Sequence, residues 1–238
     1  MESNQGARTP RRTPGTVQTM FRRIVPRYDL LNLLMSLGMD GRWRRVAAAA
    51  ARSRGASVLD LGTGTGDLAL ELHRQDAARV VGADFAPEML AAATRKAQAA
   101  SDGIVWVLTD ALHLPFADGT FDCLTNAFLL RNLADLPAGL AEMVRVLRPG
   151  GRLVCLDMTQ PPSGPFGAAY RVYFNHLLPP LAGAISGDRC AYRYLSQSLE
   201  GFPDADRMAD LLREAGLTQA SVRLLGGGVV ALHTARKP

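Results

Sequence analysis

The sequence predicts an α/β protein built on a mostly parallel, seven-stranded β-sheet whose last strand is antiparallel. Two observations carry this prediction. Between residues 57 and 158, short apolar runs alternate with helical patterns, which is typical of βαβ units whose helices cover both faces of a parallel sheet. Near the end of the chain, two apolar runs are joined by Gly226-Gly227-Gly228, which favours an antiparallel hairpin. With 238 residues, the chain is long enough to bury one large core.

The N-terminal part of the chain precedes this alternation and differs from it. Residues 1–15 are polar and rich in Arg, Pro and Gly, so we expect a disordered tail. Residues 16–54 carry helical apolar stripes and an Ala-rich run, with stops at Gly38 and Gly55, and we predict a helical lid. The expected organisation is therefore a tail followed by a single domain over residues 16–238.

The expected elements of the sheet follow in chain order. The first predicted strands are ASVLDLG, RVVGAD, IVWVLTD, FDCLTNAF and RLVCLDM, and the helices between them are DLALELHRQ, APEMLAAATRKAQAA and LPAGLAEMVRVLR. Residues 159–201 interrupt the alternation with an apolar, aromatic and proline-containing stretch, which predicts a helical insert. The helix DADRMADLLREAG and the strands TQASVRLL and GVVALHTA complete the fold.

Charge and cysteine content narrow the functional class. The formal charge is +5, and many arginines lie within the first 55 residues. These arginines could form a solvated face or could bind an anionic membrane surface or nucleic acid. The three cysteines are scattered and form no Cys/His cluster, so we expect no metal site and reduced thiols in a cytoplasmic protein. No signal-peptide core and no run of about 18 apolar residues occurs, so we expect a soluble protein, at most peripheral to a membrane.

A glycine-rich loop, DLGTGTGD, follows the first predicted strand. Glycine at Gly62, Gly64 and Gly66 lets the backbone approach a ligand at the carboxyl end of a strand. A dinucleotide fingerprint would need its third glycine at Asp67, which disfavours a pyrophosphate. The spacing that begins at Asp60 instead resembles motif I of class I S-adenosylmethionine (SAM) methyltransferases, whose ligand has an amino-acid end. The alternative is a tight turn without a ligand.

Acidic residues at the ends of the next two strands support a nucleoside ligand. Asp84 lies roughly twenty residues after the loop, where a carboxylate accepts hydrogen bonds from ribose hydroxyls, and Phe85 is placed to pack on adenine. Asp110 and Ala111 end the third strand, where a carboxylate and a backbone N–H can bind the adenine edge. Each aspartate alone is also explained as a helix cap or turn former. Three of them in this order favour SAM as the cofactor.

Several stretches of the chain together resemble the ubiquinone/menaquinone biosynthesis C-methyltransferases, from about Met20 to Lys237. They are FRRIVPRYDLLNLLMSLG with Trp43-Arg44, VLDLGTGTGDLAL, ADFAPEML, DALHLPFADGTFD, FLLRNLAD, EMVRVLRPGGRLVCLD, YRYLSQSLEGFPD and GGGVVALH. The resemblance implies a Rossmann-like class I SAM methyltransferase fold, with cofactor contacts at Thr65, Asp84, Asp110 and Ala111. Ala127 and Leu129 depart from the Ser and Gly usual in the family, and LDMTQP stands where LEFSKP is usual.

The same resemblance implies methyl transfer to a ring carbon of a reduced, polyprenylated quinol. A phenolic hydroxyl has a pKa near ~10, so the site must favour the phenolate. We expect Arg131 to stabilise that anion and Asn132 to orient the ring. Because arginine stays protonated, the proton is expected to pass to a water held by Arg131 and a carboxylate or His176, with Asp110 as a further candidate. The alternative for Arg131 is a buried ion pair with Asp135 or Asp122.

The prenyl tail would need an apolar channel, for which the insert is the expected wall and the N-terminal helices, with Phe21 and Tyr28, the expected lid. The wall residues are Phe166, Tyr170, Tyr173, Phe174, Leu177, Leu178 and Ile185. Core packing and a homodimer interface are the alternatives for these side chains. The basic N-terminal helices would help the enzyme rest on an anionic membrane.

Three other functions compete with demethylmenaquinol methylation. The first is methylation of another acceptor: a methoxy-polyprenyl-benzoquinol, which the residues do not distinguish from demethylmenaquinol because one family covers both, or another aromatic metabolite, which Ala127 and Leu129 favour slightly. The second, methylation of nucleic-acid bases, is disfavoured because NAFL stands where such enzymes carry (D/N)PPY. The third is a SAM-binding scaffold of a biosynthetic complex, which a damaged glycine loop would have supported. The quinol methyltransferase is the function we expect, and nucleic acid is not an expected partner.

Overall fold

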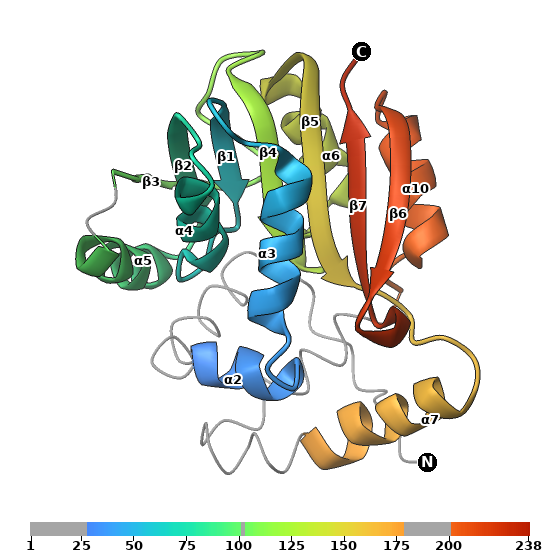
Figure 1. Cartoon of the computed structure of the whole chain (residues 1–238). Helices are drawn as coiled ribbons and strands as arrows, with labels where there is room; N and C mark the ends of the chain where they lie inside the picture. The colour runs from blue at the N-terminus through green and yellow to red at the C-terminus, as the bar shows by residue number, and fades with distance from the viewer. Residues whose placement is uncertain (1–27, 101–102, 179–200) are drawn as a thin grey trace, which may run out of the picture.

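A computed structural model describes residues 28–100, 103–178 and 201–238 and shows one seven-stranded sheet (Figure 1). Its strand order is β3-β2-β1-β4-β5-β7-β6, in which β7 is antiparallel to both of its neighbours and the other pairs are parallel. The predicted fold class is therefore confirmed. The strands are β1 (Ser57–Leu61), β2 (Arg79–Asp84), β3 (Val105–Leu108), β4 (Phe121–Ala127), β5 (Leu147–Met158), β6 (Thr218–Leu225) and β7 (Val230–Arg236).

Helices cover both faces of the sheet, as the βαβ pattern predicts. In Figure 1, α3 crosses the near face, with α4 and α5 beside it, while α6 and α10 lie behind the sheet. Buried apolar side chains form one core cluster on each face, because strands that carry helices on both sides are apolar throughout. The helices are α3 (Asp40–Ala51), α4 (Asp67–Arg74), α5 (Pro87–Ala100), α6 (Leu136–Val146) and α10 (Ala205–Glu214).

The elements beyond the carboxyl ends of the parallel strands are short. They are α2 (Tyr28–Met35), the single-turn helix η2 (Leu130–Asn132), α7 (Pro165–Val172) and the π-helical turn η3 (Tyr173–Leu177), with η4 (Gly226–Gly228) between the last strands. The Tyr173 hydroxyl donates to the Leu34 carbonyl over 2.7 Å, which joins the insert to α2. Figure 1 shows α2 and α7 at the same end of the molecule.

Some sequence-based expectations fall outside the described residues, and some element bounds differ. The predicted tail, Phe21 and Ile185 lie outside the described ranges. Strand β5 begins at Leu147, inside the predicted helix LPAGLAEMVRVLR, and its register with β4 shifts between Phe121 and Cys123. None of the helices in the described part of the chain is long and apolar enough to cross a membrane.

Candidate active site

The glycine-rich loop between β1 and α4 is held against β2 by backbone hydrogen bonds. Gly62, Gly64 and Gly66 have φ angles of 67°, 56° and 86°, in the left-handed region where residues with a side chain are strained. The Gly62 N–H donates to the Ala83 carbonyl over 2.8 Å, and the Gly64 N–H donates to Oδ2 of Asp84 over 2.8 Å. The alternating glycines are therefore required by the conformation of the loop.

Two of these glycines also lie too close to neighbouring side chains to accept a methyl group. A Cβ on Gly62 would lie 2.8 Å from Cδ1 of Leu129, and a Cβ on Gly66 would lie 2.8 Å from the Trp106 ring. Leu129 occupies the position at which the family that the chain resembles usually has glycine. Its side chain therefore sets the width of the site directly above the loop.

A pocket opens at the carboxyl ends of β1, β2 and β3, and it brings together residues from separate parts of the sequence. Five of the predicted cofactor residues line it, and Asn132 lines it as well. The lining residues are Leu61, Gly62, Asp84, Phe85, Thr109, Asp110, Ala111, Leu112, Leu129, Asn132, Leu133 and Ala134. The pocket thus combines carboxylates from two strand ends with an apolar wall, a suitable arrangement for a nucleoside.

Asp84 is the buried carboxylate of this pocket. Burial raises its pKa, while hydrogen bonds from the N–H groups of Ala86 and Gly64 oppose that rise. Each carboxylate oxygen has two lone pairs, so both can accept a further bond from a ligand hydroxyl. At Asp110, Oδ1 accepts from the Leu112 N–H over 2.9 Å, and the side chain is exposed.

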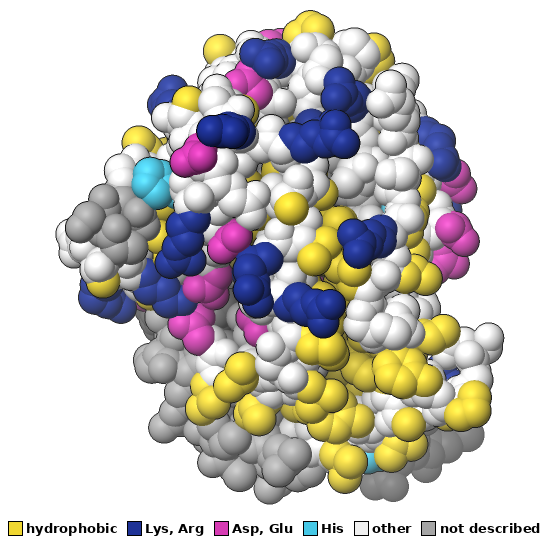
Figure 2. Space-filling view, viewed as in Figure 1, with side chains coloured by type: hydrophobic (Ala, Val, Ile, Leu, Met, Phe, Trp, Pro, Cys, Tyr) yellow, Lys and Arg dark blue, Asp and Glu magenta, His cyan; other side chains and the backbone are white. Residues whose placement is uncertain are grey.

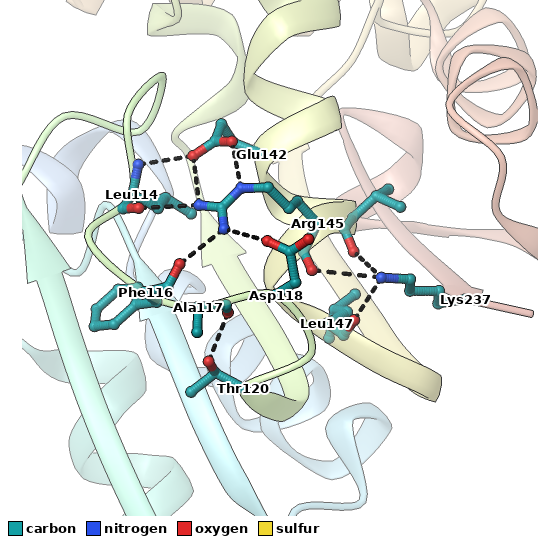
Figure 3. Close-up of polar contacts among 10 residues, drawn as sticks. Leu114, Phe116, Ala117, Asp118, Thr120, Glu142, Arg145, Leu147 and Lys237 are labelled. Carbon is teal, nitrogen blue, oxygen red and sulfur yellow. Dashed lines mark hydrogen bonds and ion pairs between the residues drawn. The ribbon is translucent and has the colours of Figure 1, made fainter.

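The loop that carries Asp110 and Ala111 is held in place by Arg145 of α6 (Figure 3). The Arg145 guanidinium donates to both Glu142 carboxylate oxygens, to Asp118, and to the carbonyl oxygens of Leu114 and Phe116, over 2.7–3.0 Å. Glu142 in turn accepts from the Leu114 N–H over 2.8 Å. One side chain therefore joins α6 to the loop that forms one wall of the pocket.

Of the three other predicted cofactor residues, Asp60 and Thr65 line a narrower cavity on the other side of the loop, together with Arg44, whereas Gly64 lines neither cavity. Burial raises the pKa of Asp60 to about 6, although hydrogen bonds from Thr63 and Thr125 and the charge of Arg44 oppose this. The Thr65 hydroxyl donates to Asp29 of α2 over 2.8 Å. Helix α2 is thus in direct contact with the glycine loop.

The segment after β4 places Arg131 and Asn132 in different surroundings. Arg131 is 6% exposed and forms an ion pair with Asp157 of β5, and its Nε has no hydrogen-bond partner among the described residues. The alternative of a buried ion pair is therefore confirmed, but its expected partners are wrong, because Asp135 caps α6 and Asp122 pairs with Arg148. The Asn132 amide donates to the Phe128 carbonyl over 3.0 Å, and its side chain lines the nucleoside pocket.

Phe128 connects this segment to α3. It has a φ of 62°, unusual for a bulky residue, and its ring lies 5.3 Å from the guanidinium carbon of Arg131 and 5.5 Å from that of Arg44. Residues held in such a conformation are found most often at functional sites, and Phe128 lies between two residues that line the described cavities, Ala127 and Leu129.

The insert contributes less to the site than expected. His176, expected to help hold a water beside Arg131, is exposed on η3 and does not line the nucleoside pocket. The carboxylate found beside Arg131 is that of Asp157. Tyr170 is the insert residue near Arg131: burial and Tyr173 raise its pKa to about 12, while the charge of Arg131 lowers it. Tyr170 also stacks on Phe174 with ring centroids 5.8 Å apart. Phe166 and Leu177, expected as wall residues, are each 53% exposed.

Two residues of this region were not assigned a role from the sequence, namely Asp157 and Arg44. Asp157 ends a predicted strand, as Asp60 and Asp84 do, so its position in the sequence was an available signal. Arg44 contributed to the family resemblance through Trp43-Arg44, but its place among several arginines of an Ala-rich helix indicated no role for it.

The strand order, the glycine loop and the acidic strand ends define a class I SAM-dependent methyltransferase. Solved structures agree on the fold. A SAM-dependent methyltransferase from Aquifex aeolicus matches with a TM-score of 0.61 at 20% identity, covering 84% of this chain and 90% of that one. The cyclase SpnF matches with a TM-score of 0.68 at 20% identity, covering 95% and 96%. Because one neighbour is titled a cyclase, these matches show the fold alone.

The chain belongs to the ubiE/COQ5 methyltransferase family, whose profile matches residues 8–237. A demethylmenaquinone methyltransferase of Thermus thermophilus is 52% identical over 221 residues, which cover 92% of this chain and 100% of that protein. A demethylmenaquinone methyltransferase of Deinococcus radiodurans is 48% identical, over 93% of this chain and 92% of that protein. A ubiquinone/menaquinone biosynthesis C-methyltransferase of Desulfotalea psychrophila is 45% identical, covering 92% and 89%. The chain is therefore a methyltransferase of the quinone-biosynthesis family.

Proposed function

We propose that this methyltransferase transfers a methyl group from SAM to a ring carbon of reduced demethylmenaquinol. The names of its relatives from Thermus and Deinococcus support that acceptor. The structural observation that carries the proposal is Arg131, a buried cation held by Asp157, whose neighbour Asn132 lines the nucleoside pocket. The acceptor must become a phenolate before it reacts, and a fixed cation next to the cofactor pocket would stabilise that anion.

The pocket residues fit SAM. Asp84 would accept hydrogen bonds from the ribose hydroxyls, because both of its oxygens are oriented by backbone N–H groups and keep lone pairs for a ligand. Phe85 would pack against the adenine ring, and Asp110 with the Ala111 N–H would meet its polar edge. Gly62 and Gly64 would allow the close approach of the remaining ligand atoms. When bound, SAM supplies an electrophilic methyl group on its sulfonium.

Arg131 then acts on the acceptor. The acceptor carbon becomes nucleophilic when its neighbouring hydroxyl loses a proton, and a guanidinium favours the resulting anion, most strongly where water is excluded. Asp157 holds that guanidinium in one orientation, so little reorganisation accompanies the reaction. We assign the proton to a water held beside the Arg131–Asp157 ion pair, with the Asp157 carboxylate as the group that receives the proton from it. We leave the exposed His176 out of the proposed site. Asn132 orients the ring at the mouth of the pocket.

The insert and α2 form an apolar surface suited to the prenyl tail. Six large apolar side chains of these elements are between 44% and 62% exposed, although such residues are usually buried. They are Leu30, Leu33, Leu37, Phe166, Val172 and Leu177. Figure 2 shows apolar side chains gathered over α2 and α7, with Arg and Lys side chains on the same face. We propose that this face meets the membrane in which the acceptor is dissolved.

An anaerobic assay with methyl-labelled SAM tests the acceptor. Short-chain demethylmenaquinol and the corresponding methoxy-benzoquinol are supplied separately, each chemically reduced. Label in demethylmenaquinol alone is the expected result. Label in the benzoquinol alone would assign the enzyme to the other branch of the family. SAM binding without label in either acceptor would overturn the quinol assignment and favour another aromatic acceptor or a scaffold.

A further inference from the structure

A second cavity lies beside the glycine loop and adjoins the nucleoside pocket, because Gly62 lines both. It is narrow and largely polar. Its lining residues are Arg44, Asp60, Gly62, Thr63, Thr65, Asp67, Leu68 and Ala127. Among these described lining residues, one is a cation and two are carboxylates. The cavity therefore offers both signs of charge to whatever part of a ligand extends past the loop.

Arg44 reaches this cavity from α3, the helix that crosses the sheet. Its side chain is 9% exposed, and among the described residues its ion pair joins Nη1 to Oδ2 of Asp40 over 3.1 Å. A guanidinium carries five N–H donors, so this bond leaves donors for a further acceptor. A nearly buried arginine is costly unless its charge is compensated. The geometry therefore suits an anionic group entering the cavity.

Asp60 provides the complementary charge at the end of β1. Its two oxygens accept from the hydroxyls of Thr63 and Thr125 over 2.6 and 2.8 Å, which fixes the carboxylate beside the loop. The nearby cation Lys96 is already bound by Asp29 and Asp67 over 2.7 and 2.8 Å. This leaves Arg44 as the cation suited to a ligand carboxylate in the described part of the cavity.

We propose that Arg44 binds the α-carboxylate of the amino-acid end of SAM, with Asp60 on the side of the α-ammonium. An amino-acid zwitterion presents the two charges on adjacent groups, which matches a cavity with one fixed cation and a facing carboxylate. The adenosine part would occupy the adjoining pocket, so the sulfonium would lie near Gly62, between the two. This inference rests on the proposed use of SAM and does not depend on which acceptor is methylated.

Calorimetric titration without any acceptor tests the proposal, with two ligands that differ only in the amino-acid end. S-adenosylhomocysteine carries that end, whereas 5′-methylthioadenosine lacks it. Arg44→Met is expected to weaken the binding of S-adenosylhomocysteine by roughly 10- to 100-fold, because a charge-assisted hydrogen-bonded pair is lost. Methylthioadenosine binding should change by less than about threefold, because its contacts lie in the nucleoside pocket.

Three further variants keep the test decisive. Arg45→Met removes an exposed arginine from the same helix and should leave the affinity for both ligands unchanged. Arg44→Lys retains the charge and should recover part of the lost affinity even if Arg44→Met is less stable. Asp40→Asn breaks the helix ion pair and should not weaken S-adenosylhomocysteine binding. Equal losses for both ligands in Arg44→Met, or no loss for either, would overturn the assignment, whatever the outcome of the methylation assay.

Discussion

The buried pair of Arg131 and Asp157 gives the prediction with the largest expected effect. In Asp157→Asn the side chain keeps its size but loses its charge, which leaves the Arg131 guanidinium uncompensated at 6% exposure. The two carboxylate oxygens also accept hydrogen bonds from the backbone N–H groups of Arg131 and Met158, over 3.3 and 2.8 Å. The substitution replaces one of these oxygens with an NH₂ group, which cannot accept. Breaking one side of a buried pair costs about 3–5 kcal/mol. For a chain of this length, that corresponds to a fall in Tm of roughly 6–20 °C.

Differential scanning calorimetry and urea unfolding measure this change, with Asp210→Asn as the matched control. Asp210 pairs with Arg213 at about half exposure, so its loss should leave Tm unchanged. The double variant Arg131→Met/Asp157→Leu should recover much of the stability, because no charge is then left buried, yet it should not methylate the acceptor. A change below about 1 kcal/mol in Asp157→Asn, or an active double variant, would refute the reasoning.

Three other outcomes are expected. Gly62→Ala should weaken S-adenosylhomocysteine binding by roughly tenfold or more, because its positive φ and a contact 2.8 Å from Leu129 oppose a methyl group; adding Leu129→Gly should recover part of the affinity in calorimetry. Arg145→Met should lower the free energy of unfolding by about 1–3 kcal/mol, because buried acceptors lose their donor, and urea titration should show that Arg145→Lys restores little. Burial raises the pKa of Asp60 to about 6, so its carboxylate is mostly charged only above that pH. The affinity for S-adenosylhomocysteine, measured by calorimetry at a series of pH values, should therefore fall as the pH drops through about 6, and Asp60→Asn should abolish this dependence.

The sheet and the glycine loop could be predicted from the sequence because their determinants are local. Each strand is a short apolar run bounded by turn residues, and the positive φ values of the loop after β1 fall on glycines, whose conformational freedom is a property of the residue itself. The acidic residues at the ends of β2 and β3 meet because parallel strands end at one edge of the sheet. Asp84 and Asp110 therefore reached one pocket as expected.

The contacts of Arg131 could not be predicted in the same way. Its partner Asp157 is 26 residues away and lies beside it because β4 and β5 are neighbours in the sheet. Arg44 reaches the glycine loop because α3 packs on the sheet, a tertiary arrangement that an Ala-rich helix pattern does not encode. His176 was assigned from its residue type, but the rotation of η3 exposes it, and rotation about a helix axis depends on packing.

The central claim is that the buried guanidinium of Arg131, beside the nucleoside pocket, favours methyl transfer to a ring carbon of the quinol. The most direct test uses SAM with an isotopically labelled methyl group, supplies the reduced and the oxidised demethylmenaquinone analogue in separate anaerobic reactions, and examines the products by NMR. We predict label on a ring carbon of the reduced acceptor alone, and none from Arg131→Met although it still binds S-adenosylhomocysteine. Label on a hydroxyl oxygen, or equal labelling by Arg131→Met, would contradict the account.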